Sequence, residues 1–304
     1  MPELPEVETV RRDLEAELVG DRITRVAATG VRTFRRQPDL AGFEARTLGR
    51  SLAGVGRRGK YLLLRLDGPD AIVVHLRMSG QLLVTPPEAP LARHTHAVFG
   101  FDAGKELRFV DPRTFGEVFV STAVPYRGGV LLEGVEGGSV GGVEGGFGGD
   151  VAAWTVPELA GLGVEPLDAR LDPARFGRLL RTRRRALKAL LLDQNVVAGI
   201  GNIYADEILW QARLRPSHRS DRLSGPAIKR LHEGMVSTLC EAIAYRGSSL
   251  ADEQYRDLHG ELGSYQSRHR VHGRVGQPCL RCGTPIRRVQ VAGRTTYFCP
   301  HCQR

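Results

Sequence analysis

Two Cys-x-x-Cys pairs near the end of the chain constrain its fold more than any other feature. Cys279 and Cys282 form the first pair, Cys299 and Cys302 form the second, and sixteen residues lie between them. Four thiolates at this spacing are typical of a tetrahedral zinc site on a β-hairpin, with Gly293 marking the turn. Because protein ligands fill all four positions, we expect one zinc ion (Zn2+) with a structural role and no metal-bound water.

A pair of disulfides is the alternative for these cysteines. The sequence shows no hydrophobic signal peptide and no apolar run long enough to span a bilayer, so we expect a cytoplasmic protein with no membrane partner. Thiols stay reduced in that compartment, which favours metal ligation. The fifth cysteine, Cys240, lies in an apolar helical context and is expected to be a buried small side chain.

Basic charge is concentrated toward the end of the chain. The formal net charge is +9, and residues 266–304 contain eight arginines and no Asp or Glu, so they carry +8 and residues 1–265 carry only +1. A second basic run, Arg181–Arg185 followed by Lys188, begins a helical pattern. Such a run is often only solvated charge, but two separate clusters favour a track that contacts the phosphates of a polyanion.

The periodicity of apolar residues changes near the middle of the chain. Strand-like runs lie between Gly, Pro and Asp residues in the first part, at Tyr61–Leu66, Ala71–Leu76, Thr95–Phe101, Glu106–Val110 and Glu117–Val120. After Pro157 the pattern is helical. The sequence therefore predicts an α+β fold, with an N-terminal β-sandwich and flanking helices, a C-terminal helical domain and a zinc-binding β-hairpin.

A glycine-rich segment separates the two parts. Eleven of the twenty-three residues in 127–149 are Gly, which predicts a flexible linker. The expected division is an N-terminal β-sandwich domain at 1–126, a linker at 127–156, a helical domain at 157–265 and a zinc finger at 266–304.

The chain begins Met1-Pro2-Glu3-Leu4-Pro5-Glu6, which can supply a nucleophile. Removal of Met1 would leave Pro2 with a free secondary amine, and an α-amino group titrates near ~7.7–8.0, so part of it is neutral at physiological pH. Attack of this amine on a sugar C1′ leads to a cationic iminium. Glu3 is placed to transfer protons, and Glu6 supplies a second acid one helical turn away.

The same residues also suit an ordinary helix start. Pro5 fits a first helical turn, and Glu6 and Glu8 fit the positive end of a helix. An apolar stripe follows at Val7, Val10, Leu14 and Leu18. On these residues alone, both interpretations stay open.

Residues 193–207, DQNVVAGIGNIYADE, form the most informative motif. Its glycines allow close backbone approach, and Asn202 is placed to begin a helix whose amides can bind phosphate, although a plain interhelical turn would look alike. The stretch resembles the helix–two-turns–helix element of formamidopyrimidine and endonuclease VIII-type glycosylases. Residues 1–14, MPELPEVETVRRDL, resemble the N-terminus of the bacterial formamidopyrimidine-DNA glycosylase family.

This resemblance implies a bifunctional DNA glycosylase and AP lyase of base excision repair. Damaged double-stranded DNA would be the partner of a monomeric enzyme, with oxidised purines such as 8-oxoguanine as substrates and β,δ-elimination nicking the strand. Pro2 would be the nucleophile, with Glu3, Glu6 and Lys60 as the other catalytic residues and Lys60 also binding a backbone phosphate. The alternatives are an endonuclease VIII-like enzyme for oxidised pyrimidines and a non-catalytic zinc-ribbon protein.

The resemblance also implies residues that hold the DNA open. Met78 would enter the gap left by the flipped base, Arg113 would face the orphaned base and Phe115 would stack beside it, although Met78 and Phe115 taken singly are more often core residues. Two departures concern opposite-base preference: Arg77 stands where the family often has glycine, and Thr114 where it often has arginine.

Further DNA-binding positions are expected in the second part of the chain. Lys188, Asn202 and Arg294 are the candidates, and Arg294 beside the turn glycine would grip the phosphates next to the everted nucleotide. The loop that covers the lesion in the family corresponds to about residues 246–258. Only its start, Gly247–Leu250, fits the family pattern.

Overall fold

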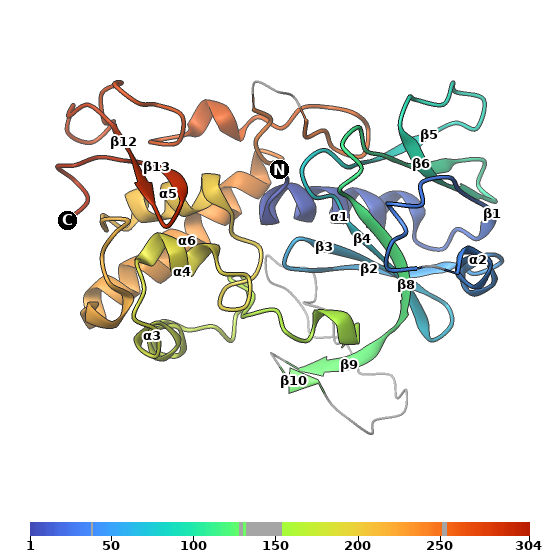
Figure 1. Ribbon diagram of the computed structural model, residues 1–304, viewed down its shortest axis with the longest axis horizontal. Coiled ribbons are helices and arrows are strands. Elements are labelled where there is room, and N and C mark those ends of the chain that lie inside the picture. The colour runs from blue at the N-terminus through green and yellow to red at the C-terminus, as the bar shows by residue number, and fades with distance from the viewer. Residues whose placement is uncertain (38, 128–129, 132–153, 251–253) are drawn as a thin grey trace. The chain divides into compact units, whose positions relative to one another are not determined.

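The computed structural model describes residues 1–37, 39–127, 130–131, 154–250 and 254–304 (Figure 1). Most of the predicted linker lies outside these residues, so its flexibility stays a prediction. The described residues form two compact units, one with those between 1 and 160 and between 245 and 264, the other with 161–244 and 265–304. The sequence predicts a single helical domain at 157–265, whereas residues 245–264 pack with the first unit.

The first unit contains two four-stranded antiparallel sheets. One has the order β1 (Ile23–Ala28), β6 (Thr95–Phe101), β7 (Glu106–Val110), β5 (Gln81–Thr85), and the other has the order β2 (Leu52–Arg58), β3 (Tyr61–Leu66), β4 (Asp70–His75), β8 (Glu117–Thr122). Apolar residues of both sheets share one core, as Leu64 and Ile72 do with Phe99 and Phe109. The predicted β-sandwich is confirmed.

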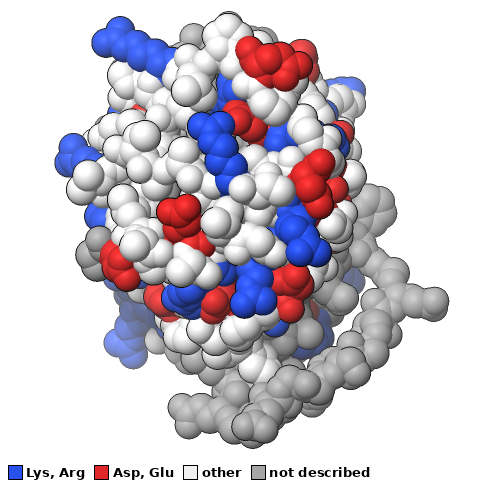
Figure 2. Space-filling model, turned by 90° about the vertical axis from the view of Figure 1, so that its right-hand side faces the viewer, with Lys and Arg blue, Asp and Glu red and all other residues white. Residues whose placement is uncertain are grey.

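Smaller elements complete this unit. They are α2 (Leu40–Thr47), β9 (Val124–Arg127), β10 (Val130–Leu131), β11 (Trp154–Thr155) and the short 3-10 helix η1 (Pro157–Leu159). Figure 2 shows one face of the molecule, on the side where Figure 1 labels β1 and α2; basic and acidic side chains are interspersed there without a continuous basic patch. This mixture agrees with the small net charge of residues 1–265.

Helix α1 (Leu4–Leu18) follows the first residues of the chain, and its apolar side packs in the core of the sandwich. The predicted stripe is completely buried, at Val7, Val10, Leu14 and Leu18. Pro5 lies in the first turn, where a missing N–H costs nothing, and Glu3 and Glu6 form a capping box that closes the helix start. Burial of the stripe fixes the position of the residues that precede the helix.

The second unit is helical and ends in the hairpin. Its elements are α3 (Pro173–Arg181), α4 (Leu187–Leu192), α5 (Asn202–Gln211), η2 (Ser220–Arg222), α6 (Gly225–Ala244), η3 (Tyr265–Arg268), β12 (Arg287–Val291) and β13 (Arg294–Phe298). Gly293 stands at the predicted turn with a positive φ of 73°. Cys240 on α6 is only partly buried, because it lies off the apolar stripe of that helix. No helix among the described residues has the length and apolar character needed to cross a membrane.

Candidate functional site

The start of the chain is held by the carboxylate of Glu6. Pro2 and Glu3 are buried, and Glu6 is 1% exposed. One Glu6 oxygen, Oε2, accepts the backbone N–H of Glu3 at 2.7 Å, and the other, Oε1, accepts that of Ser248 at 2.7 Å. A Cβ on Gly247 would lie 2.6 Å from Oε1. Since both oxygens are engaged by backbone donors, this geometry favours a positioning role for Glu6 over that of the second acid predicted from the sequence.

A buried ion-pair network connects α1 to the turn that carries Lys60. Glu8 accepts from Arg57 Nε at 3.0 Å and from Arg11 Nε at 3.1 Å, and Arg57 Nη1 donates to the carbonyl of Gly59 at 2.9 Å. Lys60 follows Gly59 in this tight β2–β3 turn and is 6% exposed. Burial alone would raise the pKa of Glu8, but the charges of Arg57 and Arg11 outweigh it and hold the pKa below its usual value. The charge pair therefore fixes the turn against the helix that begins the chain.

Met78, Arg113 and Phe115, the residues predicted to hold the DNA open, are called the wedge residues below. They lie at the tips of two loops. Met78 is 42% exposed and Phe115 is 45% exposed, and Arg113 is exposed as well, so neither apolar side chain belongs to the core. Ser79 Oγ donates to Asp111 Oδ1 at 2.5 Å, which joins the two loops at their bases. Large apolar side chains held at exposed loop tips are suited to insertion between base pairs.

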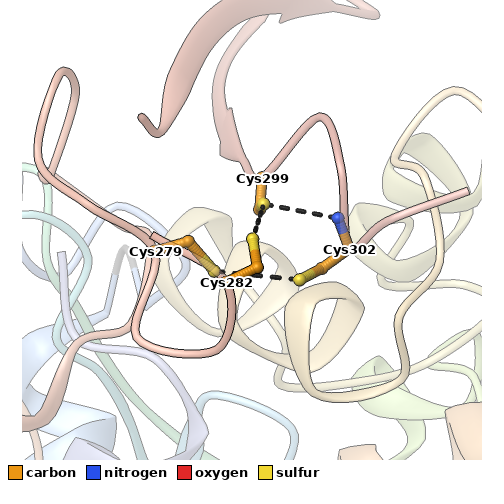
Figure 3. Close-up of side chains that lie close together, drawn as sticks. All are labelled: Cys279, Cys282, Cys299 and Cys302. Atoms are coloured by element: carbon orange, nitrogen blue, oxygen red, sulfur yellow. Dashed lines mark hydrogen bonds between the residues drawn. The ribbon is translucent and has the colours of Figure 1, made fainter. Parts of the chain in front are cut away.

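Four cysteines converge at the end of the second unit (Figure 3). All their sulfur atoms lie within 4.8 Å of one another, with Cys279 Sγ 3.9 Å from Cys302 Sγ and Cys282 Sγ 3.6 Å from Cys299 Sγ. Four sulfurs bound tetrahedrally to zinc at ~2.3 Å stand about 3.8 Å apart, so these side chains fit the ion. The cysteines form one structural zinc site, and no ligand position is left for water.

The zinc site is packed against α5. Trp210 Nε1 lies 3.5 Å from Cys279 Sγ, and the guanidinium of Arg281 stacks 3.6 Å from the centroid of the Trp210 ring. A small core of Trp210, Val271 and Ile286 surrounds the cysteines. The stability of the zinc finger thus depends on both the metal ion and its packing against α5.

The structure corrects the assignment of Lys188 to DNA. Its side chain is completely buried; Nζ donates to Asp206 Oδ1 at 2.7 Å and to the carbonyl of Thr295 at 2.8 Å. Asp206 also contacts His272 Nδ1 at 3.0 Å. An ammonium group enclosed in this way does not reach a phosphate, and it instead fixes strand β13 beside Arg294.

Arg294 is exposed as expected, at the first position of β13. Arg185, Asp193 and Ala292 line the same cavity of about 440 Å³ as Arg294. Arg185 donates to Asp193 Oδ2 at 2.5 Å, so Arg294 contributes the unbalanced positive charge among these lining residues. Such a concave surface suits a phosphate group.

The turn between α4 and α5 is braced by Gln194. Its amide donates to the carbonyl of Ile200 at 2.8 Å and accepts from Gly199 N at 2.9 Å, and Gly199 has a positive φ of 95°. The N-cap of α5 is Gly201, not Asn202, which is the first helical residue. Asn202 Oδ1 is buried without a hydrogen-bond partner among the described residues. Because this oxygen only accepts hydrogen bonds, a phosphate contact of Asn202 would have to use the donor Nδ2 or the backbone N–H.

Several residues of these sites were not identified from the sequence. Glu8, Arg57 and Ser248 engage partners far away along the chain, and no local pattern marks such pairs. Glu207 is a similar case: its buried carboxylate accepts the backbone N–H groups of residues 270–272 at 2.8–2.9 Å. Among these residues only Glu207 carries a sequence signal, because it is an acidic residue directly before the apolar Ile208 and Leu209 of its helix.

Three families match successive parts of the chain. The formamidopyrimidine-DNA glycosylase N-terminal domain matches residues 1–118, the formamidopyrimidine-DNA glycosylase H2TH domain matches residues 162–254, and the zinc finger found in FPG and IleRS matches residues 276–304. These are the parts that form the sandwich, the α4–α5 turn and the four-cysteine zinc site.

Whole proteins match as well. A formamidopyrimidine-DNA glycosylase of Nocardioides sp. is 43% identical, over 100% of this chain and 94% of that protein. The crystal structure of the MutM (Fpg) protein from Thermus thermophilus has a TM-score of 0.78 and 38% identity, covering 99% of this chain and 98% of that one. Lactococcus lactis Fpg in complex with abasic-site DNA has a TM-score of 0.81 and 32% identity, covering 99% of each chain.

The fold and the zinc finger define a DNA-repair glycosylase that binds damaged DNA. Within that class, the chain belongs to the formamidopyrimidine-DNA glycosylase family. The expected family is therefore confirmed over the whole length of the chain.

Proposed function

We propose that this enzyme removes oxidised purines from duplex DNA through its N-terminal proline and then nicks the strand. Once Met1 is removed, the Pro2 nitrogen attacks C1′ of the damaged nucleotide, the bond from C1′ to the base breaks, and the base leaves with a proton. Glu3 delivers a proton to the ring oxygen as the sugar opens and the iminium forms. Loss of a proton from C2′ then expels the 3′ phosphate, and a second elimination expels the 5′ phosphate.

The observation that carries this proposal is the fixed start of the chain. The capping box and the Glu6–Ser248 hydrogen bond hold Glu3 and the residue before it in one conformation. Preorganisation of this kind is what a nucleophile and its proton donor need. Lys60 on the braced turn is assigned to the phosphate beside the lesion, and Arg294 and Asn202 to other backbone phosphates. Met78, Arg113 and Phe115 are assigned to the gap left by the flipped nucleotide.

The finer context of this function is also a proposal. The enzyme acts as a monomer in the cytoplasm and associates with the nucleoid when it is bound to DNA. Oxidised pyrimidines are the substrates of the alternative, an endonuclease VIII-like enzyme. A panel of duplexes with single oxidised purines or pyrimidines distinguishes the two by their relative rates of excision.

Borohydride trapping tests the chemistry directly. Reduction of the iminium gives a stable protein–DNA cross-link, and peptide mapping is expected to find the DNA on Pro2. Retention of Met1 or an N-terminal tag is expected to abolish excision and trapping while damaged-DNA binding remains. Glu3→Gln is expected to slow base removal more than cleavage at a preformed abasic site. DNA found on Lys60, with the N-terminal peptide unmodified, would refute the proposal.

A further inference from the structure

Glu117 is the centre of an arginine cluster that the proposed chemistry does not use. It is the first residue of β8, directly after the loop that carries Phe115, and it is 4% exposed. Its Oε1 accepts from Arg35 Nη2 at 2.5 Å and from Arg77 Nη2 at 2.6 Å, and its Oε2 lies 3.5 Å from Arg36 Nη1. One carboxylate therefore gathers three arginines from two segments of the chain.

Two of these arginines are connected to the loops that carry Met78 and Phe115, one through the chain and the other through hydrogen bonds. Arg77 precedes Met78, and its backbone has a positive φ of 56°, so its side-chain contact holds a strained position. Arg35 donates to the carbonyls of Phe115 and Gly116, both at 2.9 Å. A substitution of Glu117 would therefore remove a contact from the arginine beside each loop.

We propose that Glu117 is a positioning residue that ties the Met78 loop and the Phe115 loop into one rigid wedge through Arg77 and Arg35. This inference rests on the proposed function, because it concerns the step in which the wedge replaces the damaged base. Burial alone would raise the pKa of Glu117, but the hydrogen bonds and charges of Arg77 and Arg35 outweigh it and lower the pKa, so the carboxylate is ionised at neutral pH. The cluster thus places Arg77, whose backbone has a positive φ of 56°, against a buried carboxylate that accepts from its side chain at 2.6 Å.

The strand register supplies a matched control. Glu117 pairs with His75 at one end of the β4–β8 ladder, and Asp70 pairs with Thr122 at the other end. Asp70 also binds an arginine, Arg46, at 2.5 Å. Asp70→Asn thus removes a comparable charge pair from the same two strands, away from the wedge loops.

The test compares two steps under single-turnover conditions with excess enzyme. On a duplex with 8-oxoguanine opposite cytosine, Glu117→Gln is expected to slow base excision about tenfold, within the range for coupled contacts. Cleavage of the same duplex with a preformed abasic site should change little, because no stacked base has to be displaced. Asp70→Asn should leave both rates near those of the unmodified chain.

A double-mutant cycle shows whether Arg77 and Glu117 act together. Arg77→Ala, which removes a side chain that is 41% exposed, is expected to slow excision in the parent chain and to add little in the Glu117→Gln background. A second readout needs no catalysis: 2-aminopurine opposite a tetrahydrofuran abasic analogue should brighten when the wedge unstacks it, and less so with Glu117→Gln.

The outcomes separate the two proposals. Additive effects, equal slowing of both steps, or slowing matched by Asp70→Asn would overturn the wedge proposal and leave Glu117 a purely structural residue. A parent chain that excises no base would refute the proposed function, and the 2-aminopurine signal would then decide for or against the wedge.

Discussion

The carboxylate of Glu6 and the backbone N–H of Ser248 form a hydrogen bond of 2.7 Å across 242 positions of sequence. The segment that contains Ser248 follows the long helix α6, yet it packs with the first unit. Arg246 strengthens this attachment through ion pairs with Asp13 at 2.5 Å and with Asp257 at 2.7 Å. Because the same Glu6 carboxylate caps the helix after Pro2, folding of this segment and order at the start of the chain are coupled.

Replacement of Gly247 by alanine should break this coupling. The added Cβ would lie 2.6 Å from Glu6 Oε1, and Gly247 has a positive φ of 78°. We expect a loss of roughly 2–4 kcal/mol in the free energy of unfolding from strain and overpacking together. Denaturant unfolding measures the loss, and single-turnover excision should fall with it.

Gly260→Ala is the matched control for that variant. Gly260 belongs to the same segment and has a φ of 83°, but a Cβ added there would have no atom within 4 Å. Only the backbone strain of about 1 kcal/mol should remain, with little change in excision. Equal effects of the two variants would show that contact with Glu6 is unimportant.

Acid should weaken the network between α1 and the Lys60 turn. The pKa of Glu8 in the folded chain is lowered, because the charges of Arg57 and Arg11 outweigh the effect of burial. A lowered carboxyl pKa contributes stability that is complete above the unfolded value of about 4.3 and is lost as the pH falls through the folded value. Glu8→Gln should therefore be destabilising at pH 7, and the difference from the parent chain should shrink below about pH 4. Urea unfolding at several pH values measures this; a constant difference would contradict it.

Local patterns were sufficient to predict much of this molecule. The apolar residues of α1 recur at helical spacing, and apolar runs such as Tyr61–Leu66 have the length of a strand. The four cysteines recur at the spacing that one zinc ion requires. Glu8 and Arg57 are 49 positions apart, and Arg77 and Glu117 are 40 apart, so the contacts that join elements have no such signature. Lys188 was misassigned for a related reason: a basic run gives the sign of the charge but not the direction in which each side chain points.

Lys188 and Arg294 should respond differently to substitution by alanine. Removal of Lys188 leaves Asp206 buried without its cation, which should cost about 3–5 kcal/mol of stability. Removal of Arg294 should leave the free energy of unfolding unchanged. It should reduce the slope of the log DNA-binding constant against the log salt concentration by about the contribution of one phosphate contact. Thermal unfolding and binding titrations at several salt concentrations measure both. An unchanged salt slope for Arg294→Ala would argue against its phosphate contact.

Zinc removal should unfold the finger before the sandwich. The cysteines share a core of few residues, which is too small to persist without the metal. Trp210 reports on this core through its contact with Cys279, and the chain has two tryptophans, so Trp154→Phe leaves Trp210 as the only indole fluorophore. Chelation should shift the Trp210 emission while the circular dichroism of the sandwich remains. Metal analysis that finds no zinc in protein with reduced thiols would contradict the prediction.

Arg113→Ala should reduce discrimination for cytosine opposite 8-oxoguanine. Arg113 is exposed, and its backbone N–H donates to Asp111 Oδ1 at 3.2 Å, so the side chain projects from a fixed loop. A guanidinium at this position can donate to the acceptor edge of the orphaned cytosine, and such contacts discriminate between bases by about 1–3 kcal/mol, or roughly tenfold to a hundredfold in rate. Excision rates opposite each of the four bases measure the loss. Arg113→Lys is the control, because it keeps the charge without the planar pair of donors. Equal loss of activity opposite every base would make Arg113 a general wedge residue that does not read its partner.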